Sequence, residues 1–196
     1  MALIAPKPPR QAADAVHSTF LALNKSRAFK SPALRSATGP LRLTEPHEVF
    51  TLGLDDLAAG KGLEVAKPTG WRYLVQEDDK VLASAESVAV GPANEHVFSA
   101  FNEGSFVASS ASAIRAAREI PEVEQGGFEL RLLNVPGLYV LALWLHGARG
   151  KDDLLVPLAP SPVEAPAGKP VPAAVLLKEL ADKARIPIEA ADRTGG

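Results

Sequence analysis

The amino-acid sequence predicts an α+β protein with a mainly antiparallel sheet of about five to six strands and helices on its faces. Three observations predict this class. Residues 71–88 alternate as a β-hairpin does, around a short polar turn that pairs the strands antiparallel. Residues 138–146 are apolar on both alternating faces, which is typical of a central strand covered on both sides. Residues 105–120 place apolar side chains at helical spacing.

The chain starts with a basic segment, residues 1–42, which its five prolines keep largely extended. This segment carries seven basic side chains and one acidic side chain, a formal charge of +6. The rest of the chain carries −8, which gives the net charge of −2. A basic arm on an acidic body is typical of chains that dock onto an acidic surface or onto each other. The basic residues are Lys7, Arg10, Lys25, Arg27, Lys30, Arg35 and Arg42.

A helix over residues 11–25 interrupts this arm, with Ala12, Val16, Phe20 and Leu23 on one face. The helix either packs on its own domain or reaches a neighbouring subunit or another macromolecule. A nucleic acid is the least favoured of these partners. Single-strand binders usually stack bases on several aromatic residues, and here no aromatic but Phe29 stands between the basic side chains.

The body of the protein opens with short elements. A strand is predicted around residues 49–54, and an acidic start followed by a glycine stop predicts one helical turn over 55–60. The hairpin comes next, with Trp71, Tyr73 and Val75 on one side of its first strand.

The most regular part of the body follows the hairpin. A short strand over 97–101 precedes the helix at 105–120, which Pro121 ends. Further strands are predicted at 128–135, 138–146 and 154–158.

The strand at 138–146 needs a covering layer on each face. The helix at 105–120 covers one face, and either the N-terminal helix or a helix over 173–185 covers the other. Leu176 and Leu180 lie on the apolar side of this last helix. Six prolines within residues 157–172 predict an extended linker, so the C-terminal helix clamps its own sheet or crosses to another subunit.

The order of hairpin, helix, three-strand meander and helix resembles the profilin-like and roadblock-like layout, in which a sheet lies between helices. It is a topological analogy drawn from the predicted elements. The predicted organisation is a basic arm with one helix (1–42), a core domain (43–159), a Pro-rich linker (160–172) and a C-terminal helix and tail (173–196).

Several chemistries are excluded by composition and spacing. The absence of cysteine excludes disulfides, thiolate zinc sites, iron–sulfur clusters and a cysteine nucleophile. Gly60–Gly62 lacks the upstream glycine and the following Ser or Thr of a phosphate-binding loop. The four histidines are well separated, and none has a second histidine at the spacing of a helical metal site.

Acidic residues carry no clear catalytic pattern. The pairs at 55–56, 78–79 and 152–153 stand at helix starts or turns, where Asp side chains bond nearby backbone amides. Glu86 and Glu129 lie in strand patterns and would form a carboxylate pair if their strands were neighbours.

The sequence therefore predicts a non-enzymatic protein-binding or structural assembly module, with no cofactor, no metal and no membrane span, in the cytoplasm. Its expected partner is another protein or a second copy of the chain. One alternative is a small-molecule-binding or hydrolytic domain whose site is assembled from distant residues, and a third is a nucleic-acid accessory protein. Trp71 and Trp144 pack in the core by default, with a partner-facing role as the alternative. The candidate partner-binding residues are Lys7, Arg10, Phe20, Lys25, Arg27, Lys30, Arg35, Trp71, Trp144, Leu176 and Leu180.

Overall fold

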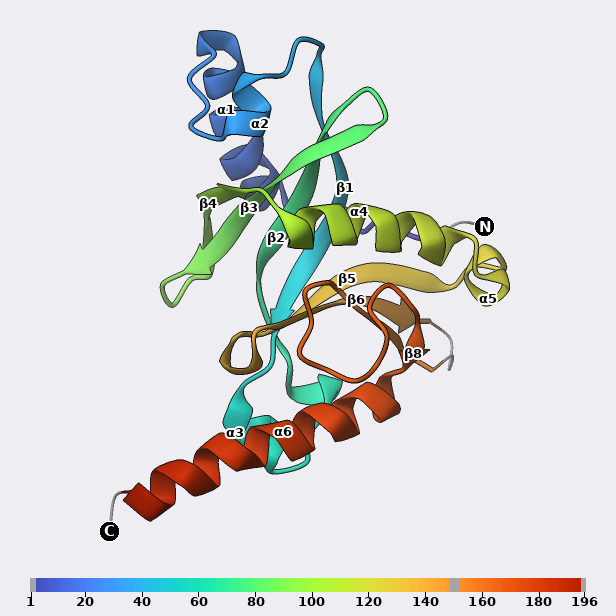
Figure 1. Cartoon of the computed structure of the whole chain (residues 1–196). Coiled ribbons are helices and arrows are strands. Elements are labelled where there is room, and N and C mark those ends of the chain that lie inside the picture. Colours follow the sequence, from blue (N-terminus) through green and yellow to red (C-terminus); the bar gives the residue numbers. More distant parts are fainter. Residues whose placement is uncertain (1–2, 149–151, 195–196) are drawn as a thin grey trace.

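The computed structural model describes the backbone of residues 3–148 and 152–194, and side chains within these ranges as far as residue 186. The described residues form one mixed sheet of eight strands with six α-helices and two short 3-10 helices, so the predicted α+β class is confirmed (Figure 1). The predicted strand count was too low, and one strand pair is parallel. Residues 149–151, next to the predicted acidic pair at 152–153, and the last two residues of the predicted C-terminal tail lie outside the described residues.

The sheet consists of two antiparallel halves. In one half the order is β4-β3-β2-β1, and in the other it is β5-β6-β7-β8. The hairpin predicted over residues 71–88 is confirmed as β2 and β3. The strands are β1 (Leu41–Thr51), β2 (Lys67–Glu77), β3 (Lys80–Val90), β4 (Glu95–Asn102), β5 (Phe128–Val135), β6 (Val140–Gly147), β7 (Leu154–Pro157) and β8 (Val171–Pro172).

A short parallel ladder joins the two halves, because β1 pairs with β5 from Glu48–Arg131 to Thr51–Asn134. Before this ladder β1 has a bulge, at which Glu45 adopts a positive φ of 51°. The N-terminal segment pairs with β5 beyond the ladder. Ile4 donates its N–H to the carbonyl of Phe128 (2.9 Å) and accepts from the N–H of Leu130 (2.8 Å).

Helix α4 (Ser105–Arg118) covers one face at the centre of the sheet, as predicted for residues 105–120. Its residues Ala113, Ile114 and Ala117 pack on β5, β6 and β7, and the buried Leu3 joins the same cluster. The short helix α5 (Pro121–Glu124) follows it. Apolar side chains from every strand of this region make up the cluster: Val49, Leu74, Leu130, Leu132, Leu143, Leu145 and Val156.

The opposite face of β5, β6 and β7 is covered by α6 (Ala173–Thr194), together with α3 (Leu54–Ala58). Figure 1 shows this half of the sheet edge-on between α4 and α6. Leu176 and Leu180 are fully buried against Leu133, Ala142, Trp144 and Leu155. The C-terminal helix is therefore the second layer over β6, and it clamps its own sheet. The 3-10 helices η1 (Leu63–Val65) and η2 (Pro136–Leu138) complete this end.

Helix α1 (Arg10–Ser26) covers a different part of the sheet, over β3 and β4. Ala12, Val16 and Phe20 are buried there against Trp71, Tyr73 and the other residues of a third apolar cluster, which also takes in α2 (Pro32–Arg35). The N-terminal helix thus packs on its own sheet, which is one of the two roles considered for it.

The Pro-rich segment after β7 does not extend away from the body. It turns back so that β8 pairs antiparallel with β7, and Gly168 donates its N–H to the carbonyl of Pro157 (2.8 Å). The Oγ of Ser109 in α4 accepts a hydrogen bond from the N–H of Ala159 (2.8 Å). No helix in the described ranges has the length and apolar character to cross a membrane.

Gly70 lies where the backbones of β2 and β3 approach each other closely, and a substitution there tests this contact. A Cβ on Gly70 would overlap the backbone carbonyl of Ser87, which cannot move without breaking the strand pair. We expect Gly70→Ala to lower the free energy of unfolding by about 3 kcal/mol, measured by urea denaturation. Gly53→Ala is the control, because a Cβ there meets its nearest atom only at 4.0 Å. Equal effects of the two substitutions would contradict the prediction.

Candidate functional site

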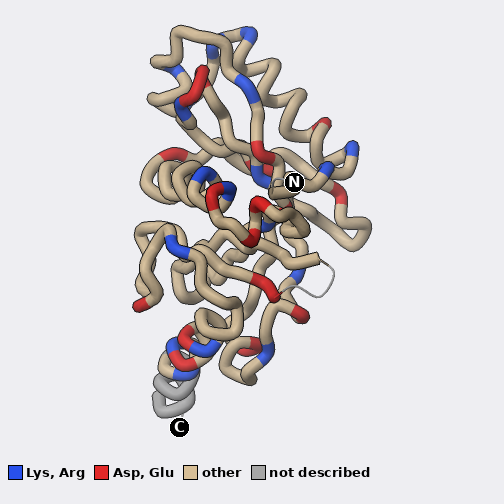
Figure 2. The backbone as a smooth tube through the Cα atoms, turned by 90° about the vertical axis from the view of Figure 1, so that its right-hand side faces the viewer, with Lys and Arg blue, Asp and Glu red and all other residues tan. Residues whose placement is uncertain are grey.

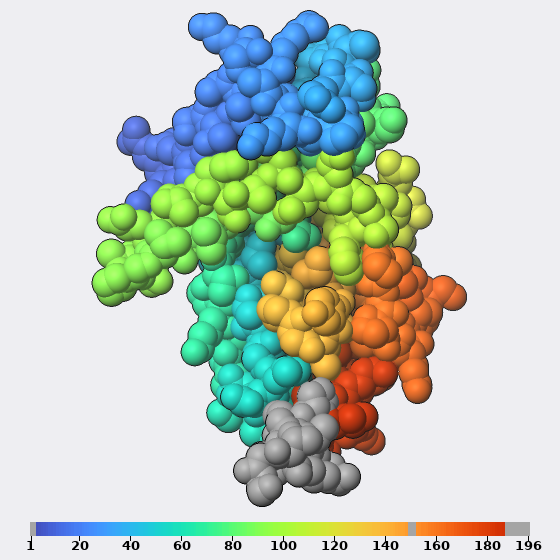
Figure 3. All heavy atoms as spheres, turned by 60° about the vertical axis from the view of Figure 1, so that its left-hand side comes forward, coloured from blue at the N-terminus to red at the C-terminus, as the bar shows by residue number. Residues whose placement is uncertain are grey.

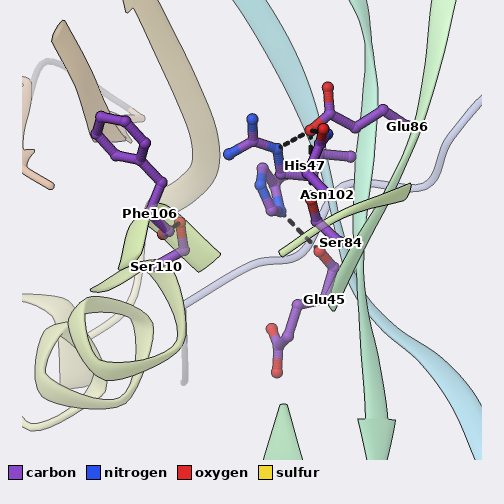
Figure 4. A network of polar contacts seen from close by, with 8 residues as sticks. Glu45, His47, Ser84, Glu86, Asn102, Phe106 and Ser110 are labelled. Atoms are coloured by element: carbon purple, nitrogen blue, oxygen red, sulfur yellow. Dashed lines mark hydrogen bonds and ion pairs between the residues drawn. The ribbon is translucent and has the colours of Figure 1, made fainter. Parts of the chain in front are cut away.

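A buried polar network lies between α4 and the β1–β4 half of the sheet (Figure 4). Strand pairing places Arg72 opposite Glu86, and the Arg72 Nε donates to the Glu86 carboxylate at 2.8 Å. The same oxygen accepts from Asn102 Nδ2 (2.8 Å) and from the Ser84 hydroxyl (3.3 Å). One carboxylate oxygen thus ties side chains of β2, β3 and β4 together.

His47 extends this network from β1. Its Nδ1 lies 2.7 Å from the carbonyl oxygen of Glu45, so Nδ1 carries the proton of the neutral ring. Its Nε2 is buried and has no hydrogen-bond partner in the described part of the chain. Burial, and secondarily the charge of Arg72, lowers the pKa of His47 to about 3. His47 is therefore neutral at physiological pH.

The centre of this network is buried, and Asn102 lies at its exposed rim. His47, Arg72 and Ser84 are all buried, and α4 with Phe106 and Ser110 lies to one side of them (Figure 4). At the bulge of β1, Arg118 of α4 donates to both carboxylate oxygens of Glu45 at 2.8 Å, which fixes the helix to β1. We assign the network a structural role in holding four strands and α4 together.

A second polar cluster lies on the α6 side of the sheet, at the end of β6. The Asp153 carboxylate accepts from the indole N–H of Trp144 (2.9 Å) and the backbone N–H of Gly147 (2.8 Å), and it lies 3.0 Å from Nδ1 of His146. The carboxylate therefore fixes the orientation of a half-exposed imidazole. A histidine held in this way is suited to general-base chemistry.

Next to it, Arg131 of β5 lies between two aromatic rings. Its guanidinium carbon is 5.0 Å from the Phe50 ring centroid and 4.9 Å from that of Trp144, and its Nε donates to Glu129 at 2.7 Å. Partial burial raises the pKa of Glu48, which lies across the parallel ladder. Arg131 counteracts that shift, and the Glu129 carboxylate adds to it. In the described ranges no group of three metal-ligating side chains occurs, here or elsewhere.

An apolar groove runs beside β4, with a volume of about 600 Å³. In its aromatic wall the centroid of the Phe101 ring lies 4.9 Å from that of Phe98, with the two rings tilted, and 5.3 Å from that of the buried Phe29, edge to face. Figure 3 shows the α1–α2 segment in blue lying against the yellow-green segment from β4 into α4. We call this the β4 groove; its lining residues are Leu23, Ala28, Lys30, Ser31, Phe98, Ser99, Phe101 and Glu103.

Basic side chains surround the α1–α2 end of the β4 groove. Lys30 lines the groove and is exposed, while Arg27 and Arg35 line a small cleft of about 70 Å³ nearby. Figure 2 shows several Lys and Arg positions at this end of the molecule, together with an acidic stretch. The nearby carboxylates are engaged by backbone N–H groups: Glu77 accepts from Thr38 (2.7 Å) and Glu103 from Ala33 (3.0 Å).

The predicted partner-binding residues fall into two groups. The basic ones are exposed: Lys7, Arg10 (which pairs with Asp14 at 3.5 Å), Lys25, Arg27, Lys30 and Arg35. The apolar ones are buried within the chain: Phe20, Trp71, Trp144, Leu176 and Leu180.

Sequence reasoning did not single out the pairs that long-range strand pairing creates. Glu86 and Glu129 do not form a carboxylate pair, because β2 and β1 lie between β3 and β5, and each is paired with an arginine instead. The pairing of His146 with Asp153 was not predicted either. Phe98 and Phe101 of the short strand at 97–101 were the one signal for the β4 groove.

No family model, curated protein or solved structure matches this chain.

His47 predicts a specific pH dependence of stability. The unfolded chain binds a proton at this histidine below about pH 6.5, whereas the folded chain does so only below about pH 3. The unfolding free energy therefore falls as pH decreases through this window, by about 1.4 kcal/mol per pH unit within it. We expect His47→Leu to remove this slope in urea denaturation between pH 6 and pH 4. An identical slope in both proteins would contradict the assignment.

The Arg72–Glu86 pair predicts non-additive substitutions. Glu86→Gln leaves a buried guanidinium without its counter-charge, and we expect a loss of about 3 kcal/mol in unfolding free energy. Adding Arg72→Met to Glu86→Gln should recover most of that loss. Thermal and urea unfolding of the two single variants and the double variant measure this coupling, and strictly additive losses would refute it.

Proposed function

We propose that the chain is a non-enzymatic protein-binding module that contacts its partner through the β4 groove and the basic residues beside it. The β4 groove is the observation that carries this proposal. It combines the half-buried rings of Phe98 and Phe101 with a polar rim of Lys30, Ser31 and Glu103. An apolar, aromatic centre inside a polar rim is the common anatomy of a protein–protein contact.

Charge supports a partner with acidic side chains. Residues 15–44 contain five Lys or Arg and no Asp or Glu. None of these five forms an ion pair with a described carboxylate, and Lys30 is the one that lines the β4 groove. A basic surface of this kind speeds the encounter with an acidic partner and selects against basic ones.

A second candidate function rests on the His146–Asp153 pair, which favours a small-molecule or hydrolytic role on the α6 side of the sheet. A hydrolytic site also needs a nucleophile or an activated water. Within the described residues no hydroxyl is hydrogen-bonded to His146. The protein-binding role is therefore the better supported of the two.

A peptide library tests the proposed function. The immobilised full chain is used to select from a displayed library of random 12-residue peptides, and affinity is measured by fluorescence polarisation. We expect the selected peptides to combine Asp or Glu with large apolar residues. Lys30→Glu should weaken their binding about tenfold, equivalent to about 1.4 kcal/mol.

Lys178→Glu is the matched control, because Lys178 is exposed on α6 and the charge change is the same. Absence of any enriched peptide would refute the proposed function. Equal losses for Lys30→Glu and Lys178→Glu would also refute it, since they would show a response to net charge rather than to the β4 groove.

A further inference from the structure

The two edges of the sheet differ in their capacity to accept another strand. At one edge β8 is two residues long and ends in Pro172, which has no N–H to donate. At the other edge β4 spans Glu95–Asn102 and pairs with β3 on one side only. In the described part of the chain, β4 is therefore the edge long enough to pair with a further segment.

Apolar surface lies on both faces beside this edge. Phe98 pairs with Ser87 and lines the β4 groove on the α1 side. Val97 pairs with Val88, and alternation places these two side chains on the opposite face. The exposed fractions of Val88, Val90 and Val97 are 36%, 41% and 43%. A strand added along β4 would alternate its side chains between the groove and these valines.

A bulge limits how much of the edge can be used. The register between β3 and β4 shifts between Glu86 and Ser87, which leaves Ser99 as the extra residue of β4. Bulges on edge strands restrict continuous edge-to-edge association. Ser99 also lines the β4 groove, so the bulge lies at the groove. The edge of β4 therefore permits only a short added segment.

We infer that the partner of the proposed function is an extended segment of another protein that binds as an added strand along β4. The inference rests on that function. The segment alternates apolar side chains on two faces and carries acidic residues at the end that meets Lys30. Main-chain hydrogen bonds to β4 would provide affinity, and the β4 groove would select the side chain that enters it.

A second copy of the chain fits this edge less well. The side chains of β4 that face the groove are Phe98 and Phe101, and both are already packed in its aromatic wall. A second β4 would bring no free apolar side chain to fill the groove.

The test is an N-methyl scan of a peptide selected on the full chain. Each backbone N–H of the peptide is replaced in turn by N–CH₃, and binding is measured by fluorescence polarisation. An added strand turns alternate N–H groups towards β4. We expect losses of at least about tenfold at alternate positions and less than about twofold at the positions between them.

A variant pair probes the valine face. Val97→Thr should weaken peptide binding about fivefold, because it removes apolar surface under the added strand. Val175→Thr is the matched control, an identical substitution at an exposed valine of α6. Both positions are exposed, so neither variant is expected to unfold the protein.

The outcomes separate this inference from the proposed function. Two results would overturn the added-strand inference alone. In the first, the peptide still binds but the losses in the N-methyl scan do not alternate. In the second, the peptide still binds and Val97→Thr and Val175→Thr change its affinity equally. Absence of peptide binding overturns both. Sedimentation that shows a dimer broken by Val97→Thr identifies a second copy as the occupant and also overturns the inference.

Discussion

The parallel ladder between β1 and β5 is the contact on which the rest of the structure depends. It spans Glu48–Thr51 and Arg131–Asn134, and it joins two antiparallel halves that would otherwise be separate small sheets. Because parallel strands need a long crossover, the intervening chain forms β2, β3, β4 and α4 before it returns to β5. The ladder also divides the core, since Val49 and Leu132 pack under α4 while Phe50 and Leu133 pack towards α6.

The structure around this ladder accounts for the buried polar groups His47 and Arg72. The bulge before it turns β1 away from β5, and Ile4 pairs with β5 in its place. His47 is buried there, and the Arg72–Glu86 pair anchors the neighbouring strands under α4. Buried ionic groups contribute little net stability compared with well-packed apolar residues, but the Glu86 carboxylate, by accepting from Arg72, Ser84 and Asn102, favours one register of β2, β3 and β4.

The candidate surface follows from which parts of the sheet the helices leave open. Helix α6 covers β6 and α4 covers the centre, whereas α1 covers one face of β3 and β4 without pairing with the edge of β4. The segment after α1 then passes beside that edge and forms the second wall of the β4 groove with Ala28 and Lys30. The basic charge of the N-terminal segment is thus carried to the one long edge of the sheet among the described residues.

Local pattern determined much of this fold from the sequence alone. The hairpin at 71–88, the helix at 105–120, the two-sided burial of 138–146 and the exposed basic residues were all readable, because periodicity and charge are properties of neighbouring residues. Only the tertiary structure decided that β1 joins β5, that α6 rather than α1 covers β6, and that Glu86 meets Arg72 and Asp153 meets His146. These depend on which distant strands become neighbours, and a change of register moves every side chain to another partner or face. The β4 groove belongs to this second group, since Phe98 and Phe101 lie in a recognisable strand but become a surface only when the chain after α1 folds beside them.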